Sequence, residues 1–145
     1  MSEFHVEHNA RPEIVYAILH YAQNGDMERL AATTDKSIST IQRMLPMIRR
    51  LGLLRDGKTF APTELGERLV FLFLNSPGLF SEAMHCLLYT AHTFDATKRF
   101  SWAYARVVDA LWARGDCIIN RQTTAELVGM VVEEASQKFG VPVEK

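Results

Sequence analysis

Nine of the polar and basic side chains between residues 36 and 58 are of the types that contact nucleic acids. Arginine, lysine, serine and threonine donate hydrogen bonds to phosphate oxygens, and arginine and glutamine also recognise base edges in the major groove. The set therefore predicts contact with double-stranded DNA. Its members are Lys36, Ser37, Ser39, Thr40, Gln42, Arg43, Arg50, Arg55 and Lys58.

The spacing of apolar residues predicts that most of this set lies on the exposed face of one helix. Apolar side chains recur at steps of three and four from residue 38 to residue 51, which is typical of an amphipathic helix with one buried face. At 100° per residue, the opposite face carries Ser39, Arg43, Pro46 and Arg50. The buried stripe consists of Ile38, Ile41, Met44, Leu45, Ile48 and Leu51.

Pro46 interrupts the expected helix on its exposed side. A proline inside a helix lacks an N–H donor, crowds the carbonyl of residue i−4, here Gln42, and costs about 3 kcal/mol. We expect the helix to tolerate a kink at this point. Such a kink would change the position of Arg50, in the last turn, relative to the first half of the helix.

Two shorter helices are predicted before this one. Arg11-Pro12-Glu13 begins a helix well, because proline suits the first turn and an acidic residue there suits the helix dipole. Asn24-Gly25 ends that helix, and Asp26 caps a second one over residues 27–33. The polar run Asp35-Lys36-Ser37 then forms a turn, with Ser37 capping the helix that follows. Together these elements predict a helix-turn-helix.

A hairpin and a further helix are predicted after it. Gly52 can take the left-handed conformation that ends a helix, and Asp56-Gly57 is a two-residue hairpin turn. Arg55 and Lys58 flank that turn, so its tip is basic. Thr63 then caps a helix that begins Glu64-Leu65-Gly66.

This order of elements resembles the winged helix-turn-helix domains of bacterial and archaeal transcription regulators, such as the multiple-antibiotic-resistance and isocitrate-lyase regulator families. The resemblance covers about half the chain, residues 11–70, and predicts a winged domain over residues 11–74. It implies that the helix beginning with residues 37–43 enters the major groove. The hairpin would be the wing, placed at the phosphates or in the minor groove.

Ten of the fourteen aromatic residues lie after Val70, which predicts a second, helical region over residues 75–139. More large apolar side chains occur there than a few short helices hide by themselves, so we expect a homodimer interface, with or without a small-molecule effector site. A flexible arm is predicted for residues 1–10 and a tail for residues 140–145. The fold class is thus mainly α. The predicted dimer contacts are Phe80, Tyr89, Trp102 and Trp112.

The bulk properties predict a cytoplasmic protein. The 145 residues contain no apolar run of the roughly 18 residues needed to span a bilayer, and the N-terminus does not resemble a signal peptide. A net charge of −1 argues against nucleic-acid binding, but residues 35–58 contain six basic and two acidic residues, a local charge of +4. Cys86 and Cys117 are too far apart in sequence to form a metal or redox motif, and we expect buried thiols.

No pattern in the sequence predicts an enzyme, a metal site or a cofactor. His85 and His92 would lie about 10 Å apart on one helix, too far to bind one metal together. A glycine-rich phosphate loop, a nucleophile elbow and an H-E-x-x-H motif are all absent from the sequence.

Three function classes remain. The first is a DNA-binding transcription regulator that acts as a homodimer, and the second is a winged-helix protein-interaction module within a larger assembly. The third is an enzyme or nuclease accessory domain, for which the sequence offers no candidate residues. Basic residues on both the helix and the hairpin favour the first, whereas the near-neutral charge is compatible with the second.

Overall fold

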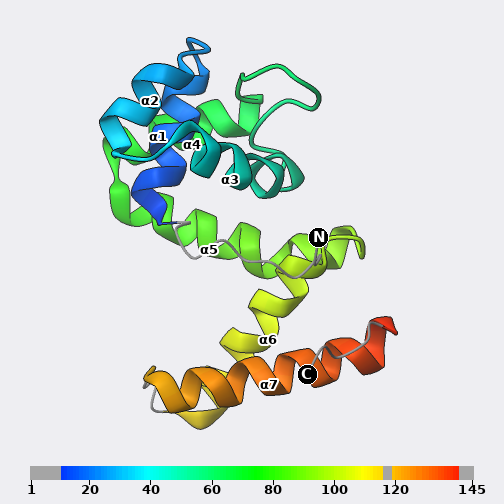
Figure 1. Cartoon of the computed structure of the whole chain (residues 1–145). Helices are drawn as coiled ribbons and strands as arrows, with labels where there is room; N and C mark the ends of the chain where they lie inside the picture. Colours follow the sequence, from blue (N-terminus) through cyan, green and yellow to red (C-terminus); the bar gives the residue numbers. More distant parts are fainter. Residues whose placement is uncertain (1–10, 116–118, 141–145) are drawn as a thin grey trace. The chain divides into compact units, whose positions relative to one another are not determined.

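The computed structural model describes residues 11–115 and 119–140, and within them every regular element is a helix (Figure 1). The expected arm at residues 1–10 and residues 141–145 of the expected tail lie outside the described residues. The mainly α class is confirmed. The helices are α1 (Pro12–Ala22), α2 (Met27–Thr34), α3 (Ile38–Arg50), α4 (Glu64–Asn75), α5 (Pro77–Phe94), α6 (Arg99–Arg114) and α7 (Arg121–Phe139).

The predicted β-hairpin wing is wrong. Between α3 and α4 the chain forms a loop closed by a single antiparallel bridge between Leu54 and Pro62, and no strand is present in the described ranges (Figure 1). Proline has no N–H to donate to a ladder, so pairing cannot extend beyond the bridge on that side. Residues 55–59 are all exposed, and a two-stranded ribbon with no apolar face to bury is unstable by itself.

The described chain divides into two compact units. Residues 11–87 form one, and residues 88–115 with 119–140 form the other. The division falls between Leu87 and Leu88, inside α5, whereas the sequence suggested a change of region between residues 74 and 75, at the end of α4.

The unit of residues 11–87 has a completely buried apolar core. α1 lies against α2 and α4, and α2 lies against α3. Each of the three helices α2, α3 and α4 begins at a side-chain cap, which accepts an N–H that would otherwise lack a partner; the caps are Asp26, Ser37 and Thr63. Side chains with 0–1% of their surface exposed include Val15, Ile18, Leu19, Leu30, Ile41, Met44, Ile48, Leu53 and Leu54.

Gly66 allows α4 to approach the end of α3 closely. A Cβ atom at this position would overlap the carbonyl oxygen of Leu53. Next to this contact, the Thr63 hydroxyl donates to the carbonyl of Gly52 at 2.6 Å and accepts the N–H of Gly66 at 3.2 Å. The start of α4 is thereby joined to the chain just after α3.

In the other unit, α6 packs against α7 around Trp102. Trp102, Ala103, Val131 and Ala135 form the buried cluster, and the ring of Phe139 meets Trp102 edge-on at 5.1 Å. Asn120 caps α7, and Thr123 completes the capping box from the third position.

Ser101 lies in the first turn of α6, and it is completely buried. Its hydroxyl donates to the carbonyl of Leu88 at 2.6 Å and accepts the N–H of His92 at 2.9 Å. The hydroxyl proton is thus committed to Leu88, so the Nδ1 atom of His92, 3.1 Å away, must act as the donor. Ser101 therefore joins α6 to the last turns of α5 and is not an activated nucleophile.

Candidate nucleic-acid interface

The turn between α2 and α3 has the length and caps of a helix-turn-helix. α2 ends at Thr34, and the next residue, Asp35, takes the left-handed conformation with φ of 51°. Three residues after the end of α2, Ser37 accepts the N–H of Thr40 at 3.2 Å. The hydroxyl of Ser37 also lies 2.9 Å from those of both Ser39 and Thr40. These three predicted DNA contacts are therefore gathered at the first turn of α3, where Ser37 also caps the helix.

α3 has one buried and one exposed face, largely as predicted. Ile41, Met44 and Ile48 are 0% exposed, and Leu45 is buried beside them. Ile38, expected in the same stripe, is 40% exposed because it occupies the first position of the helix, at the edge of the core. The opposite face carries the exposed residues Ser39, Gln42, Arg43, Pro46 and Arg50. α3 remains a continuous helix through Pro46.

The basic residues of the exposed face keep their charge uncompensated. Arg43, Arg50 and Lys58 are exposed, and none of them has an ion pair or side-chain hydrogen bond with another described residue. Lys36, in the turn, is half-buried. Unpaired guanidinium and ammonium groups on one element and its adjoining loop are what phosphate binding requires.

Arg55 was predicted to flank a hairpin turn as part of its basic tip, but in the structure its side chain is hydrogen-bonded within the loop. Its Nε donates to the carbonyl of Pro62 at 3.2 Å, and its backbone N–H donates to Ala61 at 2.9 Å. The neighbouring Arg49, in the last turn of α3, donates from its Nε to the carbonyl of Arg55 at 3.2 Å. Sequence reasoning missed Arg49, because nothing in the pair Arg49-Arg50 indicates which arginine turns toward the loop.

The four predicted dimer residues are in different environments. Phe80 is 0% exposed in the unit of residues 11–87, where its ring meets Phe73 edge-on at 5.1 Å. Trp102 is covered by α7 in the other unit, so neither ring is available at the surface of its own unit. Tyr89 is half-buried and hydrogen-bonded. Trp112 alone among the four is largely exposed, at 85%.

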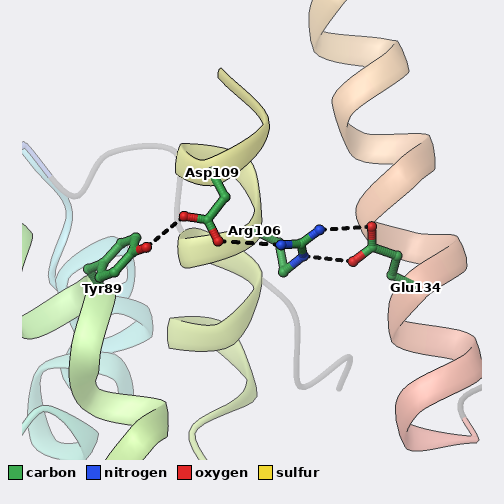
Figure 2. A network of polar contacts seen from close by, with 4 residues as sticks. All are labelled: Tyr89, Arg106, Asp109 and Glu134. Carbon is green, nitrogen blue, oxygen red and sulfur yellow. Dashed lines mark hydrogen bonds and ion pairs between the residues drawn. The ribbon is translucent and has the colours of Figure 1, made fainter. Parts of the chain in front are cut away.

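The other cluster of charged side chains connects α5, α6 and α7 (Figure 2). The Tyr89 hydroxyl donates to Asp109 at 2.6 Å, and Arg106 donates to Asp109 at 3.3 Å and to both carboxylate oxygens of Glu134 at 2.7 and 3.1 Å. Its hydrogen bond to Asp109 raises the pKa of Tyr89, and the hydrogen bond from Arg106 lowers the pKa of Glu134.

These pKa shifts stabilise the protonated tyrosine and the ionised glutamate, which is the opposite of what a proton-transfer site needs. We therefore interpret the Tyr89–Asp109–Arg106–Glu134 network as a structural connection between helices.

Among the described residues, one of the two cysteines is present, and neither a metal-binding cluster nor a membrane-spanning helix is found. Cys86 is exposed rather than buried, and Cys117 lies outside the described residues. Among residues 11–115 and 119–140, no group of three or more His, Cys, Asp and Glu side chains is placed to bind a metal ion. None of the helices in these ranges combines the length and apolar character needed to cross a membrane.

Comparison with protein-family models, curated proteins and solved structures found no match to this chain.

Proposed function

We propose that this protein is a sequence-specific DNA-binding transcription regulator that acts as a homodimer in the cytoplasm. In this proposal α2 and α3 are the helix-turn-helix, as in bacterial and archaeal regulators, and α3 enters the major groove. The observation that carries it is the two-sided character of α3. One face is fixed in the core at Ile41, Met44 and Ile48, while Gln42 and Arg43 project from the other without partners among the described residues.

The residue types support a division of labour on this surface. Glutamine and arginine can each make two parallel hydrogen bonds to a single base, so we assign base recognition to Gln42 and Arg43. Lys58, on the exposed loop, and Arg50 supply phosphate contacts. A phosphate contact requires only a positioned charge, so we expect that this loop can bind phosphate without forming a β-hairpin.

The proposal is tested by selecting duplexes from a randomised library and measuring affinity by fluorescence anisotropy. Arg43→Ala should weaken binding to the selected duplex by about 1–3 kcal/mol and reduce discrimination against single-base changes. Arg68→Ala is the matched control. It also removes one arginine charge from this unit, but Arg68 is exposed on α4 and paired with Glu64 at 2.6 Å.

Equal losses in the two variants would mean that Arg43 contributes only general charge. If the wild-type protein enriches no sequence from the library, the proposal of sequence-specific binding fails.

A protein-interaction module within a larger assembly is the second candidate. Apolar side chains on the outside of the unit of residues 11–87 favour it, since Phe71, Leu74 and Leu79 are 68%, 64% and 52% exposed. Such a surface is typical of protein contacts rather than of DNA contacts. A Leu74→Glu variant that keeps full DNA affinity would separate this surface from the one on α3.

A further inference from the structure

The loop between α3 and α4 is held by one β-bridge together with hydrogen bonds from two arginine side chains, Arg49 and Arg55. Arg55 makes three hydrogen bonds at the base of the loop: its N–H donates to Ala61, its Nε donates to Pro62, and its carbonyl accepts from the Nε of Arg49. The first two bonds join the two ends of the loop to each other. The third joins the loop to the last turn of α3.

The bond from Arg49 joins the exposed part of the loop to the helix proposed to read DNA. The start of the loop is also joined to this helix, because the N–H of Leu53 donates to the carbonyl of Ile48 at 3.1 Å. The peptide group that follows Arg55 begins the exposed segment 56–59, which includes Lys58. Fixing the carbonyl of Arg55 fixes the orientation of this peptide group. Arg49 is half-buried, and its Nε–H donates to the carbonyl of Arg55 at 3.2 Å.

We infer that Arg49 is a positioning residue of the DNA-binding surface, which sets the place of Lys58 relative to α3 through the carbonyl of Arg55. This inference rests on the proposed function. In a guanidinium, Nε carries one N–H and the two terminal nitrogens carry four. Arg49 uses Nε for the loop, and its terminal nitrogens have no partner among the described residues.

Arg50 provides a matched control because it is the adjacent residue, has the same charge and is exposed, without a bond to the loop. Backbone ¹⁵N relaxation of the DNA-free protein gives order parameters for residues 56–60, and hydrogen exchange reports on the N–H of Arg55. Arg49→Gln should lower the order parameters and speed exchange at Arg55 at least tenfold. Arg50→Gln should leave both unchanged.

Arg49→Lys is the second variant if Arg49→Gln does not fold. A lysine side chain has a carbon at the position of Nε, so the same loss of loop order is expected although the charge is kept. Loop order that is unchanged in the folded variant would overturn the inference.

DNA affinity then tests whether Arg49 acts through Lys58. Lys58→Ala should lower the slope of log affinity against log salt by about one unit in the wild-type background. In the Arg49→Gln background, the same substitution should change affinity less than twofold, because Lys58 is no longer held in place. An equal effect of Lys58→Ala in both backgrounds would show that the two residues act independently and would overturn the inference.

The two proposals can fail separately. If the wild-type protein binds no duplex, the proposed function fails and the role of Arg49 toward DNA fails with it. The relaxation measurement, made without DNA, still decides whether Arg49 orders the loop.

Discussion

The two units of this chain are stabilised in different ways. In residues 11–87, at least nine apolar side chains on three helices and the segment after α3 are 0–1% exposed, including Ile18, Leu30 and Ile48. In residues 88–140, the buried apolar side chains of α6 and α7 keep 4–8% of their surface, and the completely buried side chain is the polar Ser101. One unit is thus closed by a completely buried apolar core, and the other combines a less completely buried apolar cluster around Trp102 with hydrogen bonds and ion pairs.

This difference has a consequence for what each unit exposes. Phe94, Trp112 and Ile119 in the second unit are 86%, 85% and 67% exposed. Two packed helices have too little interior to cover such side chains, and they gain order from polar contacts such as the Arg106–Glu134 pair instead. Both units thus have apolar surface that a partner could cover, and the most exposed of these side chains, Phe94 and Trp112, are in the second unit.

The largest effect expected from a single substitution is in the first core. Ile48→Ala removes a completely buried side chain, and such a cavity should lower the free energy of unfolding by about 2–5 kcal/mol. Val131→Ala in α7, where the side chain is 8% exposed and smaller, should cost clearly less. Urea unfolding, followed by a probe in each unit, measures both. Equal losses would mean that the two cores do not differ as their burial indicates.

Two helical glycines give a sharper comparison. Alanine is preferred to glycine inside helices by about 1 kcal/mol, so the two substitutions would have the same sign if only helix propensity mattered. At Gly66 the new methyl group would overlap the backbone of Leu53, and we expect a net loss of about 1–3 kcal/mol. At Gly129 in α7 no atom lies within 4 Å of that position, and we expect a gain of about 0.5–1 kcal/mol.

Thermal unfolding of the two variants tests this difference in sign. Stabilisation by Gly66→Ala would show that α4 can move away from Leu53 at little cost. Destabilisation by Gly129→Ala would instead indicate that another surface approaches α7 at this glycine in solution.

The polar contacts of the second unit predict an acid-sensitive contribution to stability. The pKa of Glu134 is lowered in the folded protein, chiefly by its hydrogen bond from Arg106. A lowered pKa stabilises the fold above the unfolded-state pKa, about 4.3 for glutamate, and this stabilisation is lost as pH falls through the folded-state pKa. Urea unfolding at pH 6 and at pH 3 should therefore differ less for Glu134→Gln than for the wild-type protein.

Arg106→Gln provides the cross-check, because it keeps Glu134 but removes the donor. It should reduce the same pH dependence. A pH dependence unchanged in both variants would show that this pair does not contribute to acid sensitivity.

The helices were predictable because their signals are local. Apolar spacing and capping residues depend on neighbours within a few positions, so the helix-turn-helix from Asp26 to Arg50 could be anticipated, including its cap at Ser37. Whether strands pair after α3 could not be predicted in this way, because Asp56-Gly57 indicates a turn but not the strand pairing on either side of it. Pro62 and the polar residues at positions 55–59 were the signals against a ladder.

The environment of individual side chains was harder to predict, since it depends on contacts between residues distant in sequence. The partners of Arg106 lie on its own helix and, 28 positions away, on α7. Phe80 and Trp112 are both large aromatic residues in the same region, yet one is completely buried and the other 85% exposed. Composition identified a region rich in apolar side chains without showing which of them face outward.

Trp112 gives the smallest expected change in the stability of the single chain and the clearest test of the homodimer. Its side chain is 85% exposed, so Trp112→Ser should alter the free energy of unfolding of a monomer by no more than about 0.5 kcal/mol. In a dimer interface, however, a tryptophan buries about 150–250 Å² and is a frequent hot spot.

Light scattering at micromolar concentration should then give the mass of two chains for the wild-type protein and of one chain for the variant. Phe94→Ser, at 86% exposure in the same unit, separates a specific contact of Trp112 from a general effect of apolar surface. Because two linked half-sites bind DNA more tightly than one, the Trp112 variant should also lose affinity for a duplex with two half-sites but not for a single half-site. A wild-type mass of one chain, unaffected by concentration and by added DNA, would exclude the homodimer under these conditions.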